Sequence, residues 1–258
     1  MNEIKGLLID LDGVMYNEST PIPGSVDAIR VLSENRIPYR FITNTSMKSR
    51  DTLRLKLSQM GIDVTKKDIF TAVYAASMYI RALNYPECHL MLLEDAKKEF
   101  DDIPVGGDHV DFVVAGDLGE EFTYEKLNKA FLYLHNGARL IALQKNRFWL
   151  SDDGYKLDAG AFVALLEFAA GIDSIVIGKP AKPFFEMALK DIALPAENVL
   201  MVGDDIESDI AGAAALGITT CLVKTGKFRE QDLNNSLLKP DMISDSLYDC
   251  VKSLGQLE

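Results

Sequence analysis

The sequence predicts an α/β protein whose core is a doubly wound parallel sheet. Two observations carry this prediction. Short apolar runs alternate with amphipathic helical patterns through most of the chain, and polar residues follow several of these runs directly. Because open α/β sheets bind their ligands beyond the carboxyl ends of the strands, the residues after each run are the first candidates for a functional site.

Composition and charge exclude several classes of partner. The chain has 258 residues and a formal net charge of −12, which argues against nucleic acid or an anionic membrane as the main partner. Its three cysteines lack metal-ligand spacing, no apolar run approaches the length of a membrane span, and no targeting pattern opens the sequence. We therefore expect a soluble, cytoplasmic protein.

The first and last thirds carry the densest alternation and are assigned to the core. Turn residues mark the helix ends: Pro23 and Gly24 precede the first helix, and Gly61 and Gly217 stand where terminating glycines belong. The predicted strands cover 7–12, 39–43, 199–202, 219–223 and 242–244, and a further strand, 174–177, ends just before the second core segment begins at 179. The predicted helices start near 25, 53, 71, 183 and 206, with a last helix at the C-terminus.

The middle third repeats the pattern and is expected to form an inserted α/β domain over 78–178, between core segments 1–77 and 179–258. Strands are predicted over 89–93, 111–115 and 139–143, and helices over 123–136 and 161–170. Residues 145–160 are polar and contain the only tryptophan, so this stretch is either a functional loop or a hairpin with a solvated tip. Its Arg147 and Trp149 are candidates for substrate selection; alternatively, they complete the insert's own core.

The stretch DLDGV, residues 10–14, places two aspartates at the end of the first predicted strand. If 7–12 is extended, Asp10 and Asp12 point to the same face of the sheet. Two such charges 4 Å apart repel by about 4 kcal/mol at an effective dielectric near 20. The pair is tolerated where a cation neutralises it or one acid holds a proton, and both conditions suit an active site. The alternative is a solvated acidic turn.

Three further strand ends carry residues suited to phosphoryl chemistry. Thr43 and Asn44 offer a hydroxyl, an amide and backbone N–H groups for phosphate oxygens. Lys179 lies in GKP, and Asp204, Asp205 and Asp209 lie in GDDIESD. Each has a plainer interpretation, as a helix cap or a surface cation. Together they predict one crevice in a doubly wound sheet.

DLDGV, ITN, GKP and GDDIESD, in this order, resemble the four motifs of the haloacid dehalogenase superfamily. The insert between the second and third motifs resembles the C2 cap of the phosphatases of its subfamily IIA. Further likeness extends over LIALQKNRFW, DAGAFVALLEFA, GKPAKPFFEMAL and GITTCLVKTGKFR. The resemblance implies a Rossmann-like core, a C2-type cap and phosphoric monoester hydrolysis.

The resemblance also implies a role for each motif residue. Asp10 would be the nucleophile that forms an aspartyl-phosphate, and Asp12 the general acid and then base. Asp10, the carbonyl of Asp12 and Asp204 would hold Mg²⁺, with Asp209 and Asp205 supporting its outer shell. Thr43, Asn44 and Lys179 would bind the phosphoryl group.

We therefore expect a Mg²⁺-dependent phosphatase that acts on a small phosphorylated metabolite. The alternative from another class is a phospho-accepting aspartate switch, like a receiver domain of signalling proteins, without turnover. Receivers are short and uncapped and lack the acid two residues after the nucleophile. A third alternative is a former phosphatase that only binds partners, although every catalytic position is filled. A homodimer formed through the cap is left open.

Overall fold

The computed structural model describes residues 3–151 and 154–255, and only the backbone of 149–151. The chain divides into two compact units. The core unit comprises Met1–Thr43, Leu53–Phe70 and Lys179–Glu258; the insert unit comprises Asn44–Thr52 and Thr71–Gly178. The insert unit thus starts earlier than the predicted residue 78 and includes a segment that the sequence assigned to the core. Within the described ranges, no helix has both the length and the apolar character needed to cross a membrane.

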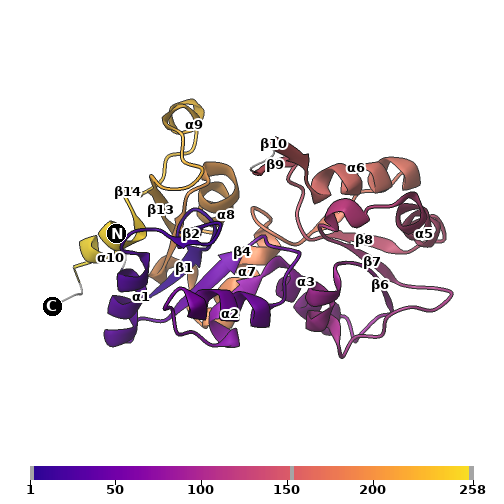
Figure 1. Ribbon diagram of the computed structural model, residues 1–258, viewed down its shortest axis with the longest axis horizontal. Coiled ribbons are helices and arrows are strands. Elements are labelled where there is room, and N and C mark those ends of the chain that lie inside the picture. The colour runs from indigo at the N-terminus through magenta and orange to yellow at the C-terminus, as the bar shows by residue number, and fades with distance from the viewer. Residues whose placement is uncertain (1–2, 152–153, 256–258) are drawn as a thin grey trace. The chain divides into compact units, whose positions relative to one another are not determined.

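The core unit is built on a six-stranded sheet in the order β14-β13-β12-β1-β4-β5 (Figure 1). β1 pairs in parallel with β12 and β4, and β13 pairs in parallel with β12 and β14. Both central strands, β1 and β12, are buried at every residue, as expected for a sheet covered on both faces. The strands are β1 Gly6–Asp10, β4 Tyr39–Thr43, β5 Ile69–Thr71, β12 Val199–Gly203, β13 Thr219–Val223 and β14 Met242–Ser244.

Helices cover this sheet on both faces, which confirms the predicted doubly wound α/β class. One apolar cluster joins β1 and β12 to α1 (Ser25–Glu34), α2 (Arg50–Gln59) and α10 (Leu247–Ser253). α7 (Lys182–Ile192) lies against β4, and a π-helical turn, Ile206–Ala211, lies against β12. A helix starts at 206 as predicted, but its first six residues form this wide turn, and only the short α8 (Gly212–Ala214) that follows is α-helical. The sequence also gave no sign of the small hairpin β2 (Tyr16–Asn17) and β3 (Thr20–Pro21), or of α9 (Glu230–Asn235).

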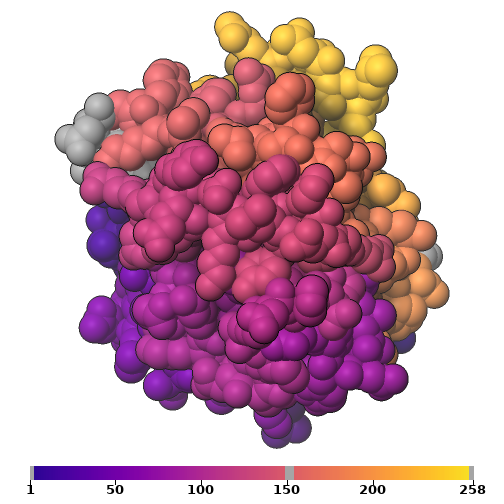
Figure 2. Space-filling model, turned by 90° about the vertical axis from the view of Figure 1, so that its right-hand side faces the viewer, coloured from indigo at the N-terminus to yellow at the C-terminus, as the bar shows by residue number. Residues whose placement is uncertain are grey.

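The insert unit has its own four-stranded sheet in the order β11-β8-β7-β6, with all neighbours parallel. Figure 2 shows one face of this unit, where the segments coloured magenta to salmon form a continuous surface. Residues 145–160 form the predicted hairpin alternative, through β9 (Phe148–Ser151) and β10 (Gly154–Leu157). The other elements are β6 Cys88–Met91, β7 Phe112–Ala115, β8 Arg139–Ala142, β11 Ile175–Val176, α3 Ala72–Ala82, α4 Glu94–Lys97, α5 Tyr124–His135 and α6 Ala159–Ala170.

Candidate active site

Asp10, Thr43 and Asp204 lie within one residue of the same level at the carboxyl edge of the core sheet. Asp10 is the last residue of β1 and pairs with Ile42, so Thr43 lies one residue further along β4. Ile9 pairs with Val202, so Gly203 lies beside Asp10 and Asp204 follows. Parallel pairing therefore brings these strand ends together, as the sequence predicted.

Lys179 lies beside Asp10 and Asp209, but the strand that precedes it is not part of the sheet that the sequence predicted. The strand before it, β11, pairs with β8 in the insert's sheet and not with the core sheet, so the prediction of a fourth core strand end was wrong. Lys179 is instead the first residue of the chain's return to the core unit. Its Nζ lies 2.8 Å from Oδ1 of Asp10 and 2.7 Å from Oδ1 of Asp209. Burial opposes its charge, but these two carboxylates hold the pKa of Lys179 above its ordinary value.

Asp10, Asp204 and Asp209 form a buried group of carboxylates whose nearest oxygens all lie within 4.8 Å of one another. Burial raises the pKa of each, and neighbouring carboxylates raise it further: Asp12 acts on Asp10, Asp10 and Asp209 act on Asp204, and Asp10 and Asp205 act on Asp209. Lys179 lowers the pKa of Asp10 and Asp209. Lys227 also lowers the pKa of Asp204, but its Nζ lies beside Asp205, at 3.7 Å from Oδ2. Two lysines therefore face four carboxylates, and the group needs either a further cation or bound protons.

Asp204 distinguishes these two ways of balancing the charge. Its Oδ2 accepts the backbone N–H of Lys227 at 2.6 Å, but its buried Oδ1 has no hydrogen-bond partner among the described residues. Buried polar atoms without partners are rare in native proteins. Since hard divalent cations prefer carboxylate oxygens, an orphaned oxygen beside two further carboxylates fits such a cation.

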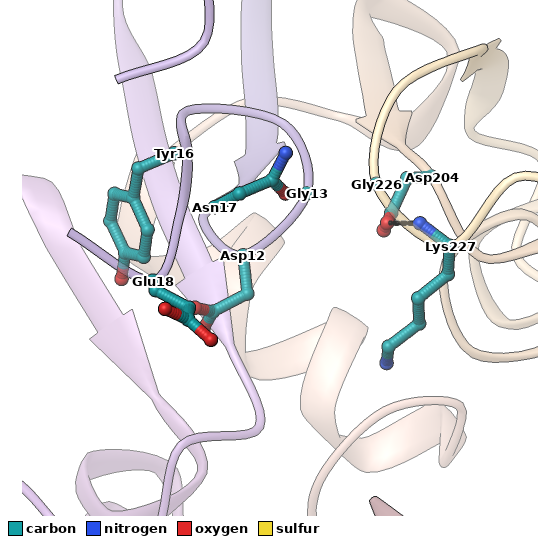
Figure 3. Close-up of a pocket in the computed structure, with 8 residues that line it drawn as sticks. All are labelled: Asp12, Gly13, Tyr16, Asn17, Glu18, Asp204, Gly226 and Lys227. Carbon is teal, nitrogen blue, oxygen red and sulfur yellow. Dashed lines mark hydrogen bonds between the residues drawn. The ribbon is translucent and has the colours of Figure 1, made fainter. Parts of the chain in front are cut away.

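Asp12 lies past the end of β1, because the strand stops at Asp10 and not at residue 12 as predicted. It lines an open pocket of about 180 Å³ together with Tyr16, Glu18 and Lys227 (Figure 3). Its side chain is exposed there. The surrounding chain still excludes enough water to raise its pKa, against the lowering effect of Lys56 and other lysines. A carboxyl group with a raised pKa at a pocket is suited to proton transfer.

Asp205 has a structural role at the start of the next turn, and its place in the outer metal shell stays a prediction. Its Oδ1 accepts the backbone N–H groups of Glu207 and Ser208, both at 3.0 Å, so it caps the turn that follows. The sequence left open which aspartate of GDDIESD is the cap, and the structure assigns that role to Asp205. Asp209 is the one that joins Asp10 and Asp204.

The remaining predicted site residues belong to the insert unit. Asn44 is its first residue, directly after the buried Thr43. Arg147 is exposed just before β9. Trp149 lies in β9, but its side chain falls outside the described residues.

Gly13 and Gly226 form a glycine cradle that packs against Asp204, and the sequence did not predict it. Gly13 and Gly226 both have a positive φ, +85° and +59°. A Cβ on Gly226 would lie 2.1 Å from Oδ2 of Asp204 and 2.4 Å from the Cα of Gly13. Thr225 fastens the two loops by donating its hydroxyl hydrogen to the carbonyl of Gly13. The only signal was a glycine after a predicted strand, which by itself indicates a turn.

Gly226→Ala is therefore expected to displace Asp204 and to weaken binding of a divalent cation by about 10–100-fold, as changes behind metal ligands typically do. Titration calorimetry with Mg²⁺ measures this. Gly217→Ala is the matched control, because Gly217 also has a positive φ (+75°) but nothing within 4 Å of its would-be Cβ. Equal loss in both variants would mean that backbone strain, not the cradle, is responsible.

Comparison with known proteins identifies the family. The model described as haloacid dehalogenase-like hydrolase matches residues 7–105, and a second model of HAD-hydrolase-like proteins matches residues 176–250. The chain is 36% identical to phospholysine phosphohistidine inorganic pyrophosphate phosphatase of Rattus norvegicus, over 99% of this chain and 96% of the relative. It is 37% identical to haloacid dehalogenase-like hydrolase domain-containing protein 2 of the same species, over 89% and 87%.

Solved structures of phosphatases superpose on nearly the whole chain. The p-nitrophenyl phosphatase from Archaeoglobus fulgidus superposes with a TM-score of 0.92 at 30% identity, covering 97% of this chain and 99% of that one. A 4-nitrophenylphosphatase from Thermotoga maritima gives 0.91 at 28% identity, with 97% of both chains covered. With the four motifs in place and relatives matched along the full chain, the protein belongs to the haloacid dehalogenase-like hydrolases, among the phosphatases of that family.

Proposed function

We propose that this protein is a Mg²⁺-dependent phosphatase that hydrolyses a small phosphorylated metabolite through an aspartyl-phosphate on Asp10. The observation that carries the proposal is Lys179, buried between Asp10 and Asp209 beside the unsatisfied Oδ1 of Asp204. This arrangement combines a nucleophile, a fixed positive charge and a set of ligands for a cation, which phosphoryl transfer requires.

The chain's own residues can carry both chemical steps. Oδ1 of Asp10 is held by Lys179, so its other oxygen attacks phosphorus while the bond from phosphorus to the leaving oxygen breaks. Asp12 donates a proton to that leaving oxygen. Asp12 then takes a proton from a water that attacks the same phosphorus, which releases orthophosphate and restores Asp10. Thr43, Asn44 and Lys179 hold the phosphoryl oxygens.

Mg²⁺ would be held by Asp10, the carbonyl of Asp12 and Asp204, with Asp209 supporting its water shell. When bound, it supplies positive charge to the phosphoryl oxygens. We assign the insert to substrate selection as a mobile cap, with Arg147 and Trp149 as candidates to meet the leaving group. A homodimer would form through the insert, where Tyr124 of α5 and Phe168 of α6 are 83% and 91% exposed.

Release of orthophosphate from a panel of phosphorylated compounds tests this proposal. The panel should include phospholysine, phosphohistidine, pyrophosphate and 4-nitrophenyl phosphate, because relatives carry these names. We expect multiple turnovers with Mg²⁺ and none after chelation. Stoichiometric labelling of Asp10 without release would instead favour the receiver-like switch, and no reaction with any compound would contradict the proposal.

A further inference from the structure

The segment Asn44–Thr52 belongs to the insert unit although core-unit segments flank it on both sides in the sequence. It follows Thr43 directly, long before the main insertion, yet it belongs to the insert unit. The helix α2 crosses the boundary between the units: its first turn, Arg50–Thr52, is part of the insert unit, whereas Leu53 and Leu57 lie in the apolar cluster of the core unit.

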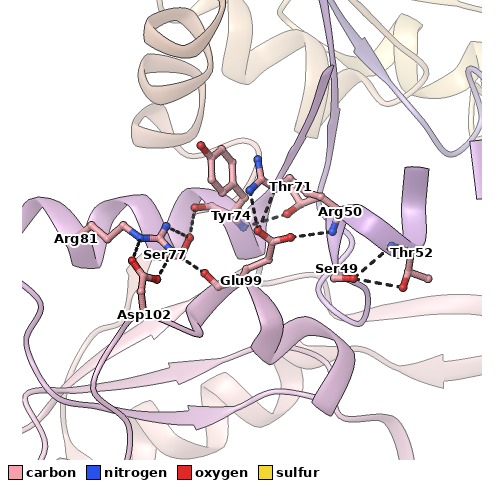
Figure 4. Close-up of polar contacts among 9 residues, drawn as sticks. All are labelled: Ser49, Arg50, Thr52, Thr71, Tyr74, Ser77, Arg81, Glu99 and Asp102. Atoms are coloured by element: carbon pink, nitrogen blue, oxygen red, sulfur yellow. Dashed lines mark hydrogen bonds and ion pairs between the residues drawn. The ribbon is translucent and has the colours of Figure 1, made fainter. Parts of the chain in front are cut away.

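A buried ion pair ties this segment to the insert (Figure 4). Glu99 accepts the backbone N–H of Arg50 at 2.9 Å through Oε1, and two guanidinium nitrogens at 3.0 and 2.9 Å through Oε2. The side chain of Glu99 is only 2% exposed. The guanidinium carbon of Arg50 also lies 3.3 Å from the ring centroid of Tyr74 in α3. Arginine is suited to this site because its planar group can stack and form several hydrogen bonds at once.

A second carboxylate of the insert completes the attachment. Asp95 in α4 accepts the backbone N–H of Ser49 at 2.9 Å and the hydroxyls of Ser49 and Thr52 at 3.2 and 3.1 Å. The first N–H groups of a helix have no partners within the helix, and negative charge is favoured near them. Ser49 caps the first turn of α2 by accepting the backbone N–H of Thr52 at 3.3 Å, and Asp95 and Glu99 complete this cap.

The other crossing between the units is in contact with the same segment. A Cβ on Gly178, the last residue of the insert unit, would lie 2.1 Å from the carbonyl oxygen of Leu143 and 2.6 Å from Oδ1 of Asn44. The backbone at Gly178 is thus packed against the side chain of Asn44. Thr43 directly precedes Asn44, and Lys179 directly follows Gly178. Both are proposed phosphoryl-binding groups.

We propose that Arg50 and Glu99 are positioning residues that clamp Asn44–Thr52 to the insert, so that the insert controls the placement of Thr43 and Lys179. The cap would then act on the phosphoryl site itself and not only on the leaving group. This inference rests on the proposed function, because it assumes that phosphate binds at these residues. Binding and clamping are reciprocal, so phosphate must also stabilise the clamp.

Hydrogen exchange with and without orthophosphate, in the presence of Mg²⁺, tests this coupling. In the unmodified protein, orthophosphate should protect amides of 10–13 and, in addition, those of 94–100. Arg50→Lys keeps the charge but loses the planar fork, and Glu99→Gln keeps an acceptor but loses the charge. Both should abolish the protection at 94–100 and raise the inhibition constant of orthophosphate by about 2- to 30-fold.

Arg81→Lys is the matched control. Arg81 forms a more exposed ion pair with Asp102 in the same unit, at 2.9 and 2.6 Å. It also donates to the hydroxyl of Ser77 and to the backbone carbonyl of Glu99, so this variant disturbs the neighbourhood of Glu99 but leaves the Glu99 carboxylate paired with Arg50. This variant should retain the distant protection and the inhibition constant of the unmodified protein, whatever it does to the melting temperature. Equal behaviour of Arg50→Lys and Arg81→Lys would overturn the inference and leave the ion pair a structural one.

Two further outcomes are decisive. Protection confined to 10–13 would overturn the coupling while supporting the phosphate site, whereas no protection at 10–13 would contradict the proposed function and this inference with it. Should Arg50→Lys not fold, Thr52→Val is the milder variant, because it removes one hydroxyl contact of Asp95 and the hydrogen bond between the hydroxyls of Ser49 and Thr52. A smaller change in the same direction is then expected, and an unchanged inhibition constant would overturn the clamp.

Discussion

Asp10→Asn is expected to abolish turnover, with a loss on the order of 10⁴–10⁶-fold, as for other enzymes that lose their nucleophile. An amide oxygen is a poor nucleophile and a weaker ligand for a divalent cation than a carboxylate. Its shape is nearly unchanged, so Lys179 can still donate to Oδ1, as it does at 2.8 Å in the structure. The measurement is orthophosphate release from the best substrate of the panel.

The fold of this variant should survive, because the change removes one of three mutually repelling buried carboxylates. Its thermal midpoint and circular dichroism spectrum should therefore stay close to those of the unmodified protein. Asp191→Asn is the control for an acid-to-amide change in the same unit, since Asp191 pairs with Arg40 outside the site. Appreciable turnover by a verified, folded Asp10→Asn sample would rule out Asp10 as the nucleophile.

The sequence predicts the group of Asp10, Thr43 and Asp204 because each of these residues follows from the position of a strand end. Asp10, Thr43 and Asp204 each come at the end of an apolar run, and the ends of parallel strands meet at one edge of a sheet. The sequence correctly predicted that Lys179 lies with the acids, but it wrongly predicted that the strand before Lys179 belongs to the core sheet. Its preceding strand completes the insert's sheet, and a short apolar run does not reveal which of two sheets it will join.

Contacts between residues distant in the sequence could not be predicted in this way. Arg50 and Glu99 look like ordinary charged positions of two helices, and only the folded insert shows that they form a buried pair. Gly226 similarly gives no sign in the sequence that it packs against Gly13 and Asp204. Such partners are chosen by tertiary packing, which periodicity and local motifs do not encode.

Asp12→Asn is expected to lower turnover by about 10²–10⁴-fold, the usual contribution of a positioned acid–base group. Asp12 must be protonated when the leaving group departs and ionised when water attacks, so its loss slows both steps. Partial removal from solvent raises the pKa of Asp12, so at any given pH a larger fraction of it is in the acid form. Raising the pH removes that proton, so the unmodified protein should lose activity on the alkaline side in a way that the variant does not.

A substrate with a good leaving group separates the two roles of Asp12. Release of 4-nitrophenolate needs little help from an acid, so the Asp12→Asn variant should still phosphorylate Asp10 and give a burst of one nitrophenolate per active site. Hydrolysis of the aspartyl-phosphate still needs the base, so the steady rate after the burst should be low. Glu18→Gln is the control, because Glu18 lines the same pocket but has no assigned proton-transfer role. If Asp12→Asn shows no burst and keeps the pH profile of the unmodified protein, the proton-transfer role belongs to another group.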